Sequence, residues 1–157
     1  MKATVLSTDF VLEISGVRYR HHPNGGGLVA ETAKVAKTAY VGPFAWVHGH
    51  VRVLDNVKIL DCAQIFGHVQ LSGNVRVFDH AQVSGYAEVS GSAWIYGYAQ
   101  VSNHAKISSY VRISGHARIL DFVQVAGDVQ VFGHPRLYGG NLKVSGQTQI
   151  FGKVFLS

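Results

Sequence analysis

From Leu28 onward, hydrophobic and polar positions recur along the chain with a period of six residues. Units beginning at Trp46 read W-V-H-G-H-V, R-V-L-D-N-V, K-I-L-D-C-A and Q-I-F-G-H-V, and later units such as Q-V-S-G-Y-A keep the same order. The second residue is aliphatic, the fourth is usually Gly or Asp, and the sixth is usually Ala or Val. This period matches neither the ~3.6-residue period of a helix nor the two-residue alternation of a hairpin meander. It predicts one short strand and one corner in every unit.

The second positions form an unbroken aliphatic series, which predicts a continuous core. Residues 28–135 are 108 residues, or 18 consecutive units. Their second residues are Val29, Val35, Val41, Val47, Val53, Ile59, Ile65, Leu71, Val77, Val83, Val89, Ile95, Val101, Ile107, Ile113, Ile119, Val125 and Val131. β-Branched side chains dominate this series, as is typical of short, buried strands.

The fourth position of each unit predicts the corner. It usually holds glycine, asparagine or aspartate, which tolerate the left-handed backbone that a sharp corner needs. Three units would close one triangular coil, and coils would stack through parallel strand pairing at about 4.8 Å. One extra residue interrupts the frame at 139–142. The 18 units, the interrupted unit and the two that follow make 21, which predicts seven coils.

This pattern resembles the hexapeptide-repeat family, in the variant seen in uncharacterised bacterial and phage repeat proteins. The resemblance covers residues 28–154 and implies an all-β fold, a single-stranded left-handed parallel β-helix. In the best-known enzyme branch, glycine directly follows the aliphatic residue, whereas here it comes one residue later, as in Val83-Ser84-Gly85. The segment 25–33 is also similar to that variant. Members of the family are commonly trimers packed side by side, so we expect a homotrimer.

Residues 1–27 lie outside the repeat, and we expect them to form a capping segment on a β-helix over 28–157. The stretch from Val11 to Arg20 alternates around Gly16, which predicts a β-hairpin. Such a hairpin would cover the strand edges of the first coil, which would otherwise be open.

Composition narrows the class of protein. The 157 residues fit one domain, and a hydrophobic content of 47% with a strict pattern indicates a packed core. No apolar run approaches the ~20 residues that span a bilayer, and Asp9 and Glu13 argue against a signal peptide. Cys62 is the only cysteine, which excludes an internal disulfide. We therefore expect a cytoplasmic protein or one assembled into a phage particle.

Outward side chains would stack in columns with a period of 18, and one face combines cations with aromatic rings. Its residues are Arg76, Phe78, Trp94, Tyr96, Arg112, Phe132 and Phe151. Tyr98 completes the set of candidate binding residues, and it falls in an adjoining corner column with Cys62, His80, His116 and His134. An apolar strip on a flat wall usually marks an interface, and rings flanked by cations can hold sugars or an anionic polymer. The net charge of +5 favours anionic partners in the same direction. Ordinary exposed strand residues remain an alternative interpretation.

The histidines raise the question of a metal site, because the γ-class carbonic anhydrases of this family bind zinc through three histidines between subunits. His80 and His116 fall two coils apart on one corner, or about 9.6 Å, which is too far to share one ion within a chain. We therefore predict no metal and no cofactor. If a metal is bound, His80 and His116 are the candidates.

An enzyme remains the alternative to a binding protein. The acyltransferase branch uses a histidine between subunits as general base, and in that case His116, His80 and Tyr96 are the candidate catalytic residues. The repeat predicts neither the projecting loop nor the C-terminal helix typical of that branch. There is no known nucleic-acid-binding motif, which argues against a nucleic-acid partner. We thus favour a non-enzymatic structural or interaction β-solenoid that presents its basic-aromatic face to a partner or polyanionic polymer.

The aromatic column of this face, which holds Phe78, Tyr96, Phe132 and Phe151, gives a first testable prediction, on self-association. If Tyr96 and Phe132 lie in a seam between copies, placing a carboxylate there buries an unpaired charge. Tyr96→Glu and Phe132→Glu should each yield monomers by light scattering, and an unchanged mass would contradict the seam.

Overall fold

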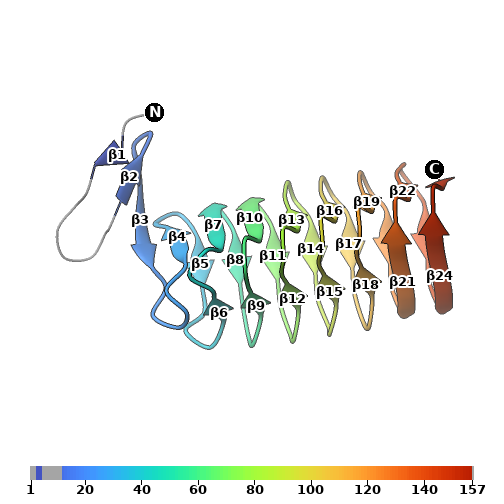
Figure 1. Cartoon of the computed structure of the whole chain (residues 1–157), viewed down its shortest axis with the longest axis horizontal. Coiled ribbons are helices and arrows are strands. Elements are labelled where there is room, and N and C mark those ends of the chain that lie inside the picture. Colours follow the sequence, from blue (N-terminus) through green and yellow to red (C-terminus); the bar gives the residue numbers. More distant parts are fainter. Residues whose placement is uncertain (1–2, 5–11, 157) are drawn as a thin grey trace.

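The structure is a computed structural model that describes residues 3–4 and 12–156. Within these ranges the chain forms 25 short strands and no helix, so it contains no helix that could cross a membrane. The strands wind into about seven coils stacked along one axis, with β1 to β3 beside the first coil (Figure 1). The predicted all-β solenoid with parallel sheets is therefore confirmed.

Three sheets make the walls of the solenoid. Sheet A consists of β1 (Ala3–Thr4), β2 (Leu12–Ile14), β3 (Val17–His21), β4 (Leu28–Ala30), β7 (Trp46–Gly49), β10 (Gln64–Gly67), β13 (Gln82–Val83), β16 (Gln100–Val101), β19 (Arg118–Ile119), β22 (Arg136–Leu137) and β25 (Phe155–Leu156). Sheet B consists of β5 (Lys34–Val35), β8 (Arg52–Val53), β11 (Gln70–Leu71), β14 (Glu88–Val89), β17 (Lys106–Ile107), β20 (Gln124–Val125) and β23 (Lys143–Val144). Sheet C consists of β6 (Tyr40–Val41), β9 (Lys58–Ile59), β12 (Arg76–Val77), β15 (Trp94–Ile95), β18 (Arg112–Ile113), β21 (Asp128–Gly133) and β24 (Gln147–Gly152).

The core consists of the second and sixth residues of each unit. All second-position residues from Val41 to Val131 are buried, as are the small sixth-position residues such as Ala81 and Ala99. Val35, in the first coil, is only partly buried. Burying one such aliphatic side chain is worth roughly 1.5–3 kcal/mol, so the repeat supplies most of the stability through this central column.

Backbone hydrogen bonds join each coil to the next rather than closing within a coil. Gln82 N donates to the carbonyl of Ala99 at 2.9 Å, and Ser84 N donates to the carbonyl of Val101 at 2.9 Å. The resulting strand register is 18 residues, for example Lys106 opposite Gln124. After the extra residue it becomes 19, with Gln124 opposite Lys143. The predicted slip is therefore confirmed, and it leaves the stacking intact.

The corners have the backbone that the fourth position predicts, and their aspartates add a bond between coils. Asp79 has a φ of 58°, and its Oδ2 accepts a hydrogen bond from Gly97 N at 3.0 Å. Asp55 and Asp121 accept equivalent bonds from the coil that follows. Ser109 also has a positive φ of 68°, which its residue type did not predict. The corner aspartates thus hold adjacent coils together.

The hairpin predicted at the N-terminus is present between β2 and β3, with Ser15 and Gly16 at positive φ in its turn. Val11, where the predicted hairpin begins, and residues 1–2 and 5–10 of the predicted capping segment lie outside the described residues. β3 pairs antiparallel with β4 and so extends sheet A beyond the first coil.

The segment after β3 closes the open end of the first coil. His22 is only 5% exposed, and its Nε2 lies 3.2 Å from the carbonyl of Ala36. The amide of Asn24 donates to the carbonyl of Ala39 at 3.0 Å, and the Asn24 carbonyl accepts from Val41 N. Edge carbonyls and amides of the first coil therefore have partners that the capping segment supplies.

The corner bond of Asp79 gives a prediction on stability. Asp79→Ala loses the bond to Gly97 N and replaces a residue type that tolerates positive φ by one that does not, so the free energy of unfolding should fall by about 1–2 kcal/mol. Asp79→Asn keeps an acceptor oxygen and tolerates the left-handed backbone, so it is the matched control and should lose less. Urea unfolding of both variants tests this, and equal losses would contradict it.

His48 gives a prediction on pH. Its ring stacks on Phe66 at 5.1 Å, and partial burial lowers its pKa below the ordinary 6.5. The unfolded chain therefore binds the proton more readily, and the stability due to neutral His48 should be lost as pH falls below about 6.5. In His48→Phe, which keeps the stack, the urea midpoint should fall less between pH 7.5 and pH 5 than in the parent. An identical fall would contradict this assignment.

Candidate binding surfaces

Sheet C carries the predicted basic-aromatic face in two parallel columns. In the first column Arg76, Trp94 and Arg112 lie in register on β12, β15 and β18. The guanidinium carbons of Arg76 and Arg112 lie 5.0 Å and 5.3 Å from the centre of the Trp94 ring. The indole is therefore held between two cations, an arrangement worth about 0.5–1 kcal/mol per contact at an exposed site.

The second column is a row of stacked rings with one interruption. Phe78 and Tyr96 stack at 4.8 Å with an interplanar angle of 2°, and Phe132 and Phe151 stack at 5.4 Å with 12°. Ser114 stands between the two pairs, and a hollow of about 320 Å³ lies there. The sequence thus predicted the residues of this column correctly, and the structure shows that they form two stacks.

Tyr98 lies in the corner column where the sequence placed it, outside the two columns of the flat face. It lies on the corner between sheets C and A, where it stacks on His80 and His116 at 5.0 Å each. His134 continues this row below His116 at 5.0 Å. The opposite corner carries a longer row of the same kind, made of His50, His68, Tyr86, His104 and Phe122 with ring separations of 4.7–5.1 Å. Ring faces in both rows are largely covered by neighbouring rings, and their edges face outward.

The candidate catalytic and metal-binding residues His80, His116 and Tyr96 do not lie together in one site. Tyr98 stands between His80 and His116, while the ring of Tyr96 stacks on Phe78 in the other column. Over the described ranges, no three or more His, Cys, Asp or Glu side chains gather closely enough to hold a metal ion.

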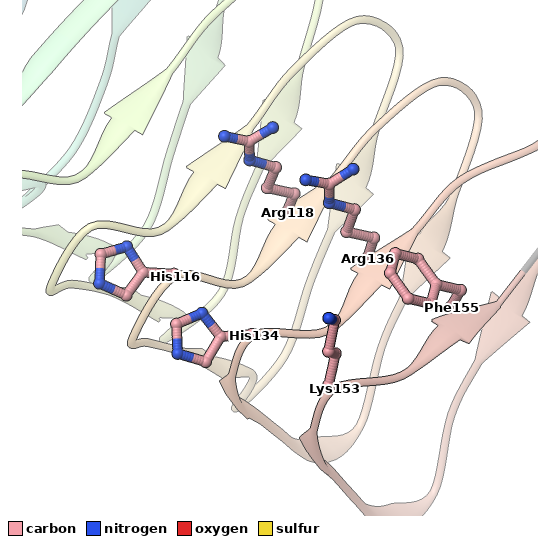
Figure 2. A pocket seen from close by; sticks show the side chains of 6 residues that line it. All are labelled: His116, Arg118, His134, Arg136, Lys153 and Phe155. Atoms are coloured by element: carbon pink, nitrogen blue, oxygen red, sulfur yellow. The ribbon is translucent and has the colours of Figure 1, made fainter.

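One hollow lies beside the corner between sheets C and A, and we call it the basic hollow. It has a volume of about 460 Å³ and is lined by His116, Arg118, His134, Arg136, Lys153 and Phe155. Arg118 and Arg136 extend in the same direction from successive strands, with His116 and His134 side by side at the corner (Figure 2). The guanidinium carbon of Arg136 also lies 5.7 Å from the ring centre of Phe155. Three fixed cations and two imidazoles therefore border one hollow.

The cations of the basic hollow have no carboxylate partner in the described part of the chain. The ion pairs among the described residues lie elsewhere. They are Arg18 with Glu31 and Lys106 with Glu88, the latter at 3.2 Å between successive coils of sheet B. Like charges directly opposite each other on neighbouring strands are destabilising. Arg118 and Arg136 are therefore held in a repulsive register that a bound anion would relieve.

The sequence contains a signal for the basic hollow in the spacing of its residues. Arg118 and Arg136 are 18 residues apart, as are His116 and His134, so the same period that defines the aromatic column predicts both pairs. Lys153 and Phe155 follow one coil later but after the extra residue, which shifts their spacing to 19. Only the structure shows that the slip leaves them in the same columns.

Comparison with known proteins agrees with this architecture. One family model, described as the YdcK beta solenoid repeat, matches residues 69–85. The chain is a β-solenoid repeat protein. No curated protein and no solved structure gives a significant match to it.

Proposed function

We propose that this β-solenoid is a non-catalytic binding protein for an acidic polysaccharide, whose charged groups occupy the basic hollow. The observation that carries the proposal is the in-register pair Arg118 and Arg136 beside Lys153, without a carboxylate among the lining residues. Guanidinium groups form strong charge-assisted hydrogen bonds with carboxylate and sulfate oxygens. The imidazole edges of His116 and His134 add further hydrogen-bonding groups at the rim.

The periodic scaffold suits a polymer better than a single small anion. Equivalent side chains repeat at about 4.8 Å along the solenoid, so a chain lying along the axis meets cations on successive coils. A second, smaller hollow of about 230 Å³ is lined by Thr32, Lys34, His50, Val51 and Arg52 near the first coils. This smaller hollow lies on sheet B, a different wall from the basic hollow on sheet A, so the polymer site consists of the successive coils that carry Arg118, Arg136 and Lys153.

The corner rings favour a polysaccharide over a nucleic acid. Proteins that bind single-stranded nucleic acids commonly offer aromatic faces on which bases stack. At this corner, Tyr98 is stacked on both sides and His116 lies between Tyr98 and His134. The corner therefore presents ring edges and charges, which recognise acidic groups rather than base faces.

We further propose that the chain is a variant of the hexapeptide-repeat family, functioning as a rigid interaction protein in a cell or phage particle. The six-residue period, the three sheets and the continuous aliphatic core support this assignment. The long rows of stacked corner rings are consistent with a rigid rod.

The polysaccharide proposal predicts which charges matter. The double variant Arg118→Gln/Arg136→Gln should weaken binding to polygalacturonate or dextran sulfate by at least about tenfold, because it removes two charge-assisted contacts. The matched control Lys37→Gln/Lys58→Gln removes the same charge from distant coils and should change affinity much less. Biolayer interferometry in a series of salt concentrations measures both effects, and affinity should fall as salt rises.

Three outcomes would overturn the proposal. Equal losses in the two double variants would mean that only net charge matters. Binding to neutral dextran as strong as to dextran sulfate would remove the role of the cations. Preferential binding of single-stranded DNA over both acidic polysaccharides would assign the surface to nucleic acid instead.

A further inference from the structure

The aromatic column of sheet C lacks one ring, and the gap has two open aromatic faces. Phe78 covers one face of Tyr96, and Phe151 covers one face of Phe132. The remaining faces of Tyr96 and Phe132 border the hollow of about 320 Å³ above Ser114. This differs from the corner rows, where Tyr98 and His104 are each covered on both sides. We call this gap the ring slot.

The distance between the two open ring faces of the slot leaves room for one planar ring. Tyr96 and Phe132 lie on β-strand registers two coils apart, or about 9.6 Å. A ring inserted midway would lie about 4.8 Å from each neighbour, close to the 4.8 Å and 5.4 Å separations within the two existing stacks. Serine at position 114 leaves this place empty, since its side chain is too short to reach the level of the rings.

The ring slot also has a cation at one side. Arg112 lies in β18 and Ser114 directly follows this strand, so along the extended backbone both side chains project from the same face, about 6.7 Å apart. Arg112, Gln130 and Ser114 line the hollow together with the two rings. Within the described ranges Arg112 makes no ion pair, and its guanidinium contacts Trp94 at 5.3 Å. The separation suits an acidic group bonded directly to an aromatic ring, which then faces the guanidinium.

We propose that the ring slot binds a small aromatic carboxylate, with its ring between Tyr96 and Phe132 and its carboxylate on Arg112. Offset stacking on two faces provides the attraction for the ring. The amide of Gln130 and the hydroxyl of Ser114 can donate to further acceptors on the ring edge. This site is independent of the basic hollow, because the two share no lining residue.

The test uses three probes of matched size: benzoate, benzamide and cyclohexanecarboxylate. Benzoate should bind saturably, and benzamide should bind about tenfold more weakly because it lacks the charge. Cyclohexanecarboxylate should not displace bound benzoate, because it lacks the flat faces of an aromatic ring. Trp94 lies against Arg112, so its emission should change when the carboxylate engages the guanidinium. The chain holds two tryptophans, so the titration is read in a Trp46→Phe background and repeated by ligand-observed NMR.

Substitutions separate the ring slot from a general surface effect. Ser114→Phe supplies the missing ring, so benzoate binding should be lost while the melting temperature rises. Ser108→Phe, at the equivalent unit position on sheet B, is the matched control and should leave both properties unchanged. Arg112→Gln should reduce benzoate affinity to that of benzamide, and this variant gives an independent measurement if Ser114→Phe fails to fold.

Several results would overturn the ring slot. They are no saturable benzoate binding, benzoate binding that survives in Ser114→Phe, and equal affinities for benzoate and cyclohexanecarboxylate. Light scattering excludes another occupant, since a drop in mass on Ser114→Phe would mean that a ring from a second copy fills the gap. None of these results depends on polysaccharide binding, so the two proposals fail separately.

Discussion

Each coil of this protein rests on the previous one through parallel backbone hydrogen bonds, and this contact decides almost everything else. Bonds such as Gln82 N to the carbonyl of Ala99 run from coil to coil. They place every residue beside the equivalent residue of the next coil, at about 4.8 Å. Residues of like kind therefore stack on one another, inside and outside. The core benefits directly, because aliphatic side chains pack on aliphatic side chains over the whole described repeat.

On the surface the same stacking brings together side chains that attract each other in some columns and repel each other in others. Opposite charges in one column form a pair, as Glu88 and Lys106 do, whereas Arg118 and Arg136 face each other with like charge. Rings in one column cover one another, so a complete row offers edges only. An interrupted row offers two open faces, which is how a single serine at position 114 creates the hollow of the proposed ring slot. Function in such a protein is therefore expected where a column departs from its own pattern.

The sequence predicted the repeat, the corners, the one-residue slip and the hairpin between β2 and β3, because each depends on local residue type and spacing. It also predicted the members of the aromatic column on sheet C. It also placed Tyr98 in the corner column with His80 and His116, where these rings stack. It did not predict the basic hollow, because the six lining residues come from two neighbouring columns and the repeat gives no distance between columns.

What the sequence determined by itself is the inward half of the protein, because the aliphatic positions repeat with one period and admit one way of burying them together. The tertiary structure decided the outward half. Whether stacked side chains pair, repel or leave a gap depends on the distance between columns and on which ring faces remain uncovered. Those quantities arise only when three sheets meet at corners, so Arg112, Arg118 and Ser114 acquire their proposed roles from neighbours in other coils and columns rather than from their own residue types.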